Sequence, residues 1–248
     1  MKITAIKNIL SNNCQKCLNR NSYYKTAPLK SDMFCKKYSP VLSMNEAKKY
    51  LQKIREQNMS GDDKITLIML KMRYLEENQI IKQRMNYGEY YTNFKTENIA
   101  KTLEGKCINQ KIILYRGFAL DDFGYDINDK NAINEFYEKG KIITYPIFLS
   151  TSLDKDTASK FPWYIKKEQR YIMKIYTDNA IRGIYLENML SRREKEDLYY
   201  DFPNEEEVYV DRLLKLQMLD KYKDDEGRVI IETLALGHDC VESFKQKL

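Results

Sequence analysis

The chain has 248 residues, of which 43% are hydrophobic and 31% are charged, with only 9 glycines and 5 prolines. This composition excludes collagen-like, low-complexity and wholly disordered proteins, and the length suits one large domain with an added helical part. No stretch approaches the ~18 apolar residues of a membrane span, and the first apolar run is too short for a secretory signal. We therefore expect a soluble protein of a cytosol, unless it is exported by a route that needs no N-terminal signal.

The net charge of +6 belongs to the N-terminal part of the chain. Residues 1–60 contain 12 Lys and Arg against 3 Asp and Glu, whereas the rest contains 30 against 33. A basic segment of this kind can contact an acidic protein surface, a membrane surface or nucleic acid, although a solvated lysine-rich segment has the same composition. The interpretation is a basic N-terminal extension over residues 1–42, followed by one domain over residues 43–248.

The five cysteines are odd in number and unevenly spaced, which indicates free thiols in a reducing compartment and not a disulfide framework. Cys14 and Cys17 form a CxxC pair, and Cys35 follows at a distance that suits zinc. A fourth ligand is missing nearby. No metal site is therefore predicted.

Helical spacing marks the first part of the domain, over about residues 43–105. Ser43 and Glu46 form a capping box, which predicts a helix from about 44 to 57. After Gly61, a second helix is predicted from Ile65, Ile68, Met69, Met72 and Leu75. A third, short helix is predicted from Thr96, Ile99, Ala100 and Leu103, before Gly105.

From Lys111 the pattern changes to that of strands, and this sheet core covers about residues 106–248. Strands are predicted at 112–115 (IILY), from 141 (KIITYPIFLSTS), from 171 (YIMKIYT) and from 207 (EVYV). A helix capped by Asn128 or Asp129 and ended by Gly140 lies between the first two. The run LKLQMLDKYKDDEGRVIIETLAL predicts a terminal hairpin. Helices followed by short strands indicate an α+β fold with an antiparallel or mixed sheet.

Two predicted strands end in polar groups that the strands themselves do not need. In LYRGF, Arg116 can grip a phosphate with paired hydrogen bonds, and Gly117 lets a ligand approach the backbone. In FLSTS, the hydroxyls of Ser150, Thr151 and Ser152 can orient both a ligand and a carboxylate. Taken alone, each segment is also explained by an ordinary solvent-facing strand end.

A third segment, FPNEEEV, places three glutamates before an apolar strand. On an extended chain Glu205 and Glu207 share one face and Glu206 points the opposite way. Two carboxylates on one face suit a reaction with a cationic, sugar-like transition state. A solvated acidic loop is the ordinary alternative for such a triplet.

Together and in this order, the segments resemble the mono-ADP-ribosyltransferases of the Arg-Ser-Glu class, which includes bacterial exoenzyme toxins, phage enzymes and vertebrate arginine-specific ectoenzymes. The resemblance covers roughly residues 60–248. It implies an ADP-ribosyltransferase-like α+β fold, with N-terminal helices followed by two small mixed or antiparallel sheets around an NAD cleft. It also implies NAD as the substrate, no metal, and a monomeric effector or toxin that modifies a protein in a host cytosol.

The resemblance assigns roles to the first two segments. Arg116 matches the arginine that holds NAD through its phosphate or ribose, and Gly117 would offer backbone groups to the nicotinamide amide. Ser150 matches the serine that positions the catalytic glutamate. Thr151 and Ser152 would shape the same strand end and join the NAD contacts.

The resemblance also implies which residues bind the sugar and the ring. Glu207 matches the catalytic glutamate, which is hydrogen-bonded to the nicotinamide ribose and stabilises the oxocarbenium ion. Phe161 lies where relatives carry an aromatic residue that packs on nicotinamide or supports the phosphate loop. Trp163 and Tyr164 are alternatives for that position.

The acceptor is implied by the residue two positions before the catalytic glutamate, where glutamate is associated with arginine acceptors and glutamine with asparagine or related ones. Here it is Glu205, a carboxylate that can orient a guanidinium and accept its proton. Phe202 fits the aromatic residue of the acceptor-recognition turn. The charged loop over 193–203 departs from many relatives, so the acceptor protein stays open. A branch that uses an early histidine is disfavoured, because the only histidine is His238.

Two other functions remain compatible with the sequence. An NAD glycohydrolase of the same fold would pass ADP-ribose to water. A catalytically silent module could bind a partner through the basic N-terminal segment.

Overall fold

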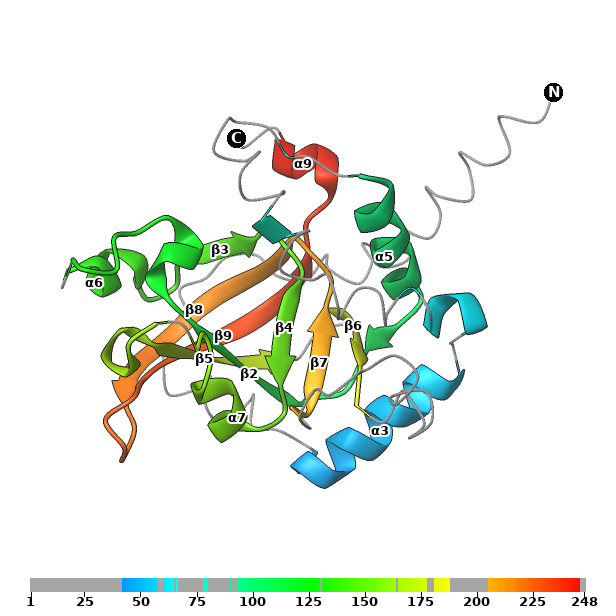
Figure 1. Ribbon diagram of the computed structural model, residues 1–248, viewed down its shortest axis with the longest axis horizontal. Coiled ribbons are helices and arrows are strands. Elements are labelled where there is room, and N and C mark those ends of the chain that lie inside the picture. Colours follow the sequence, from blue (N-terminus) through cyan, green and yellow to red (C-terminus); the bar gives the residue numbers. More distant parts are fainter. Residues whose placement is uncertain are drawn as a thin grey trace. The chain divides into compact units, whose positions relative to one another are not determined.

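The computed structural model (Figure 1) describes residues 42–57, 60–64, 66, 78–79, 90, 93–129, 131–163, 165–177, 181–187 and 205–245. All of these belong to the unit Tyr38–Leu248. Residues 1–41 and the apolar residues that predict the second helix lie outside the described ranges. Tyr164, Phe202 and the loop over 193–203 lie outside them as well.

The first described helix, α3 (Met44–Gln57), has the predicted bounds. The predicted capping box is present, because Ser43 N donates to Glu46 Oε2 at 2.8 Å and Glu46 N donates to Ser43 Oγ at 3.4 Å. Ala47, Leu51 and Arg55 are buried, and this spacing places them on one face of the helix. Helix α5 (Phe94–Glu104) confirms the short helix before Gly105.

Among the described residues, nine strands form one mixed sheet in the order β1-β6-β7-β4-β2-β5-β9-β8-β3. Strands β5 and β9 pair in parallel, and the other described pairs are antiparallel. The bounds are β1 (Cys107–Ile108), β2 (Ile113–Phe118), β3 (Ile142–Tyr145), β4 (Leu149–Ser152), β5 (Tyr171–Thr177), β6 (Ile181–Tyr185), β7 (Glu207–Val210), β8 (Leu214–Lys223) and β9 (Val229–His238).

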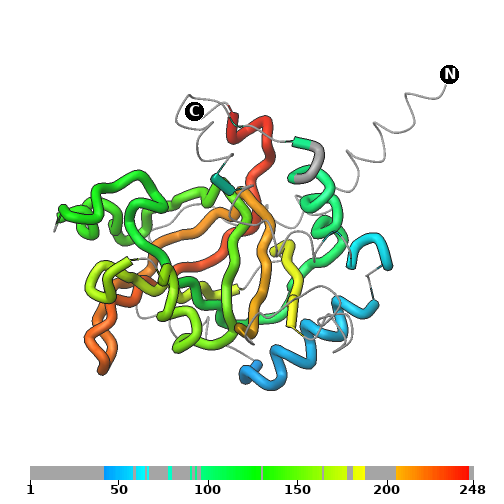
Figure 2. The backbone as a smooth tube through the Cα atoms, viewed as in Figure 1, coloured from blue at the N-terminus to red at the C-terminus, as the bar shows by residue number. Residues whose placement is uncertain are grey.

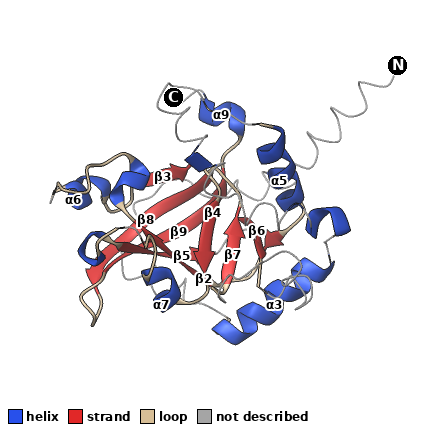
Figure 3. Cartoon of the chain, in the orientation of Figure 1, coloured by secondary structure: helices blue, strands red, loops and turns tan. Residues whose placement is uncertain are grey.

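This sheet confirms the α+β class and corrects the expectation of two separate sheets. The two halves of the ladder, β1-β6-β7-β4 and β2-β5-β9-β8-β3, are joined between β4 and β2 by one residue pair, Tyr115 with Ser152. In Figures 1 and 3, β4 and β7 run in a different direction from β8 and β9. The junction therefore separates two differently oriented halves while the pairing stays continuous.

Short elements complete the chain: η1 (Leu120–Phe123), α6 (Ala132–Phe136), α7 (Lys155–Ser159), η2 (Lys167–Gln169) and α9 (Val241–Lys245). The N-cap of α6 is Asn131, so the predicted cap at Asn128 or Asp129 is wrong. Asp129 instead accepts the backbone N–H of Asn131 at 2.8 Å, which forms a turn, and the helix begins only after this turn, at Ala132.

The run from Lys141 forms two strands and not one, because β3 pairs with β8 whereas β4 pairs with β7 and β2. Pro146, which cannot donate to a ladder, lies between them. The predicted C-terminal hairpin is confirmed as β8 and β9. Strand β6, which the sequence does not reveal, contacts α3, and Figure 2 shows the two side by side.

Candidate active site

Gly117 in β2 lies against the backbone that follows strand β4. A Cβ at this position would come within 2.0 Å of the Ala158 carbonyl oxygen and 2.3 Å of the Phe161 carbonyl oxygen. The space beside Gly117 is therefore filled by the backbone of α7 and of the residues that follow it. Its neighbour Arg116 donates from Nη1 to the Ser150 carbonyl oxygen at 3.0 Å, which brings the first two sequence segments together.

Ser150 and Glu207 are in contact across β4 and β7. Ser152 pairs directly with Glu207, so both lie on one face of the ladder, and Ser150, two residues earlier, shares that face. Ser150 Oγ donates to Glu207 Oε1 at 2.5 Å. Glu207 is 7% exposed, so this carboxylate is held by a hydroxyl in a largely water-excluded position.

The other two hydroxyls of the STS segment bind backbone. Thr151 Oγ1 donates to the Val208 carbonyl oxygen, and Ser152 Oγ donates to the Glu205 carbonyl oxygen, both at 2.6 Å. Both residues are buried. These contacts fix the start of β7 and the residues before it, while direct contact of Thr151 and Ser152 with NAD stays a prediction.

The glutamate triplet is not extended throughout. Glu206 has φ 51°, in the left-handed region, and the strand starts only at Glu207. The prediction assumed that the triplet is extended, so that simple alternation places Glu205 and Glu207 on one face. That assumption is wrong, because alternation requires an extended residue between them. The side chain of Glu206 is bound by Lys48 Nζ at 2.6 Å and by the hydroxyl of Tyr185.

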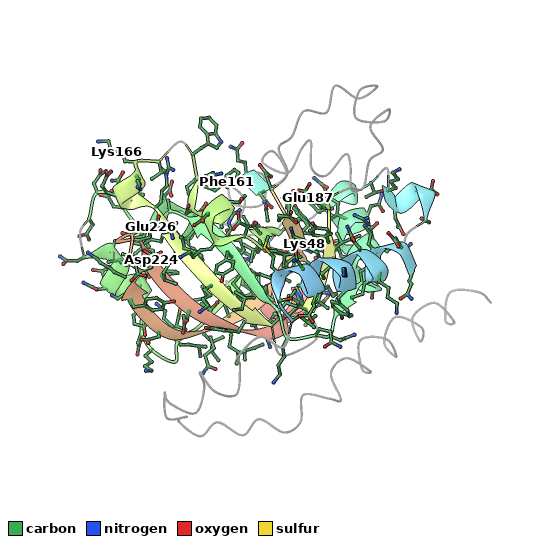
Figure 4. The ribbon with its side chains drawn as sticks, turned by 90° about the horizontal axis from the view of Figure 1, so that it is seen from below. Lys48, Phe161, Lys166, Glu187, Asp224 and Glu226 are labelled. Atoms are coloured by element: carbon green, nitrogen blue, oxygen red, sulfur yellow. The ribbon has the colours of Figure 1, made fainter. Side chains whose placement is uncertain are left out.

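Glu187, two residues after the end of β6, is a fourth glutamate at this place, and sequence reasoning missed it. Its Oε1 accepts the backbone N–H of Glu205 at 3.2 Å and that of Glu207 at 3.4 Å. It is 6% exposed, and Figure 4 labels it together with Lys48 of α3. A glutamate after a short apolar run carries no sequence signal, since only the pairing of β6 with β7 reveals the contact.

The loop after α7 carries the aromatic candidates. Arg170 holds this loop by donating to the carbonyl oxygens of Lys160, Trp163 and Ile165 at 3.1, 3.1 and 2.7 Å. Phe161 has the backbone contact with β2 at Gly117, whereas the side chain of Trp163 is 73% exposed. Of the two described candidates, Phe161 is therefore the one beside the Arg116 strand.

The electrostatics of the site follow from burial. Burial, followed by the hydrogen bond to Glu206, raises the pKa of Tyr185 well above its usual value, so the phenol stays a proton donor. Burial lowers the pKa of Arg55, whose Nη1 donates to the carbonyl oxygens of Tyr185 and Glu187.

Within the described ranges, no group of His, Cys, Asp and Glu has the arrangement of a metal site. In the same part of the chain, no helix has the length and apolar character needed to cross a membrane.

A buried carboxylate held by a hydroxyl can stabilise a sugar oxocarbenium ion, and a guanidinium on a neighbouring strand, β2, can bind a phosphate. Fold and site together define the class of enzymes that break the bond between nicotinamide and ribose in NAD and pass on ADP-ribose. The sequence profile of the ADP-ribosyltransferase exoenzyme family matches residues 47–237, and the chain belongs to this family.

Solved structures share the fold. The C3 exoenzyme of Clostridium limosum matches with a TM-score of 0.59 and 18% identity, over 80% of this chain and 97% of that one. C3stau2 of S. aureus, solved with NAD, matches with a TM-score of 0.60 and 12% identity, over 80% and 98%. The component C2-I of the Clostridium botulinum C2 toxin matches with 0.56 and 19%, over 81% and 48%. No curated protein matches the chain.

Family membership confirms the resemblance inferred from Arg116, Ser150 and Glu207. The protein is an NAD-dependent mono-ADP-ribosyltransferase, and NAD is its substrate.

Proposed function

We propose that this enzyme transfers ADP-ribose from NAD to an arginine side chain of a target protein. The observation that carries the proposal is the turn in which Glu205 lies two residues before the serine-held Glu207, with the backbone N–H of both glutamates on one carboxylate oxygen. In the class that the sequence resembles, a glutamate at the position of Glu205 is associated with arginine acceptors. The choice of glutamate there, and not glutamine, supports arginine.

In the proposed reaction, the bond between ribose C1 and the nicotinamide nitrogen breaks, and its electron pair leaves with nicotinamide. Glu207 stabilises the positive charge that develops on the ribose. A guanidinium nitrogen of the acceptor then forms the new bond to C1, and its proton passes to Glu205. Arg116 binds a phosphate or the ribose of NAD, and Phe161 packs on the nicotinamide.

The proposal includes the setting of the reaction. The enzyme acts as a monomeric effector or toxin on a protein of a host cytosol, which agrees with the exoenzyme description of the family. Contact between the basic N-terminal segment and an acidic surface of the target is part of the same proposal. The separation of an extension over residues 1–42 from the catalytic domain stays a prediction.

The test is Glu205→Gln, which keeps the size of the side chain and removes the base. We expect transfer to a guanidine acceptor such as agmatine to fall at least ~100-fold, because general base catalysis contributes about that much or more. Hydrolysis of NAD should persist, because water needs no guanidinium to be deprotonated. Labelled NAD, measured as product on agmatine and as free nicotinamide, reports both activities in one assay.

Three other results would contradict the proposal. If both activities fall together, Glu205 helps to build the NAD site and the argument for arginine fails. If transfer persists on Ser, Thr or Asn, the acceptor is wrong although the class of enzyme stands. If the wild-type protein releases nicotinamide but labels no protein in cell lysates and no agmatine, the enzyme is an NAD glycohydrolase.

A further inference from the structure

The turn Glu205–Glu207 is held at every peptide by contacts from two neighbouring strands. From the side of β4, Ser152 Oγ donates to the Glu205 carbonyl oxygen at 2.6 Å and Leu153 N donates to the Glu206 carbonyl oxygen at 3.0 Å. From the side of β6, the two N–H groups of Glu205 and Glu207 converge on Glu187 Oε1. The side chain of Glu187 thus binds the backbone at both ends of the turn.

The turn needs such support because of its central residue. A residue other than glycine persists in the left-handed region only where its surroundings over-determine it. Glu206 is held there through its carboxylate, by Lys48 from α3 and Tyr185 from β6. A turn of this shape redirects both neighbours of Glu206, so its geometry decides where the carboxylates of Glu205 and Glu207 lie.

The support continues behind Glu187. Arg55 of α3 is buried and donates from Nη1 to the Glu187 carbonyl oxygen at 2.5 Å and to the Tyr185 carbonyl oxygen at 3.2 Å. Leu186 N donates to the Glu207 carbonyl oxygen at 2.9 Å. Helix α3 therefore holds the end of β6, and the end of β6 in turn holds the glutamate turn.

We propose that Glu187 is a positioning residue of the reaction, which acts through the two backbone N–H groups of Glu205 and Glu207 and not by contact with NAD. A carboxylate accepts N–H hydrogen bonds more strongly than a neutral oxygen, and this suits a residue that must hold a strained turn. The inference rests on the proposed role of Glu207 as the catalytic glutamate. It does not require that the acceptor is arginine.

The experiment compares Glu187→Ala, Glu187→Asp and Glu187→Gln in the full chain, by release of nicotinamide from NAD without any acceptor. The alanine variant should lose at least about tenfold in kcat, because both hydrogen bonds to the turn disappear, while KM for NAD stays within about twofold. The aspartate variant, in which the oxygens are drawn back by one methylene, should lose at least about fivefold with the charge retained. The glutamine variant keeps an acceptor oxygen and should stay within about threefold of the wild type.

Controls separate positioning from folding. Thermal unfolding is recorded for each variant, and rates are compared only at temperatures where all variants are folded. Glu226→Ala is the matched control, because Glu226 lies in the exposed turn of the β8–β9 hairpin, paired with Arg228, and its loss should leave kcat unchanged. If Glu187→Ala does not fold, the aspartate and glutamine variants still carry the test.

Three outcomes would overturn the inference. An unchanged kcat in the aspartate variant would mean that the turn holds its shape without Glu187. A raised KM with unchanged kcat would make Glu187 an NAD contact. A glutamine variant slower than the aspartate variant would mean that the charge at this position matters and the placement of the acceptor oxygen does not. Failure of transfer to agmatine in the wild-type protein would affect only the arginine proposal, because this assay contains no acceptor.

Discussion

Replacement of Gly117 by alanine tests whether the backbone of α7 lies directly on β2. The added Cβ would lie 2.0 Å from the Ala158 carbonyl oxygen and 2.3 Å from that of Phe161, and real Cβ atoms essentially never approach another atom within 3.0 Å. Both oxygens belong to backbone, so no side chain can turn away to make room. The segment from Ala158 to Phe161 must therefore move by about 1 Å, the difference between the first distance and that limit.

The magnitude follows from this displacement. Overpacking of a tight contact costs about 1–3 kcal/mol, and two backbone contacts place Gly117→Ala near the upper end. For a chain of this size, about 3 kcal/mol lowers Tm by about 6–12 °C. The same movement shifts Phe161 relative to Arg116, and a misplacement of about 1 Å can cost up to ~100-fold in rate. We expect kcat/KM for NAD to fall at least about tenfold.

The assay combines thermal unfolding with release of nicotinamide at a temperature where the variant is folded. The matched control is Gly105→Ala, since Gly105 has φ −86° and no atom lies within 4 Å of its added Cβ. That substitution should raise stability by about 0.4–1 kcal/mol, because it restricts only the unfolded chain. If Gly117→Ala has the same Tm and the same kcat/KM as the control, then α7 does not pack on β2 as described, and the reasoning is refuted.

Two further predictions concern charge. Glu207→Gln keeps a partner for Ser150 but removes the negative charge, so hydrolysis and transfer should both fall at least ~100-fold with the Tm retained; more than a tenth of the activity left would contradict the catalytic role. Burial, followed by the charge of Arg182, lowers the pKa of His238 to about 3. Between about pH 3 and 6.5 the unfolded state therefore binds one more proton at this residue than the folded state, and stability falls as the pH falls through that range. Between pH 7 and 4, His238→Gln should therefore lose less stability than the wild type, measured by denaturant unfolding. Burial raises the pKa of Asp211 to about 6, and this group contributes with the opposite sign, but it does so equally in both proteins. Parallel stability curves for the wild type and His238→Gln would show that the imidazole does not titrate in this way.

The elements that sequence reasoning predicts well are those with a strong local period. Helix α3, strands β5 and β7 and the β8–β9 hairpin lie at their predicted places, because one-sided or complete burial imposes a period of 3.6 or 2 on the apolar residues. The enzyme class was predicted by another route, the resemblance of three ordered polar segments to a known family, and each segment lies in or beside a strand. Strand β6 was not predicted, because IRGIY is short and Arg182 and Gly183 interrupt its apolar residues.

The sequence by itself determined the α+β class, and it singles out Arg116, Ser150 and Glu207 as the candidate site residues. The tertiary structure alone decided how these residues are held. Glu187 binds a turn about 20 residues away in sequence, and Lys48 reaches Glu206 across a separation of 158 residues. A periodic pattern reports which side of its own element is buried, but contacts of such long range depend on strand pairing and helix packing. The shape of the glutamate turn depends on those contacts, because the left-handed conformation of Glu206 is unfavourable for an isolated glutamate and is stable only where α3 and β6 bind it.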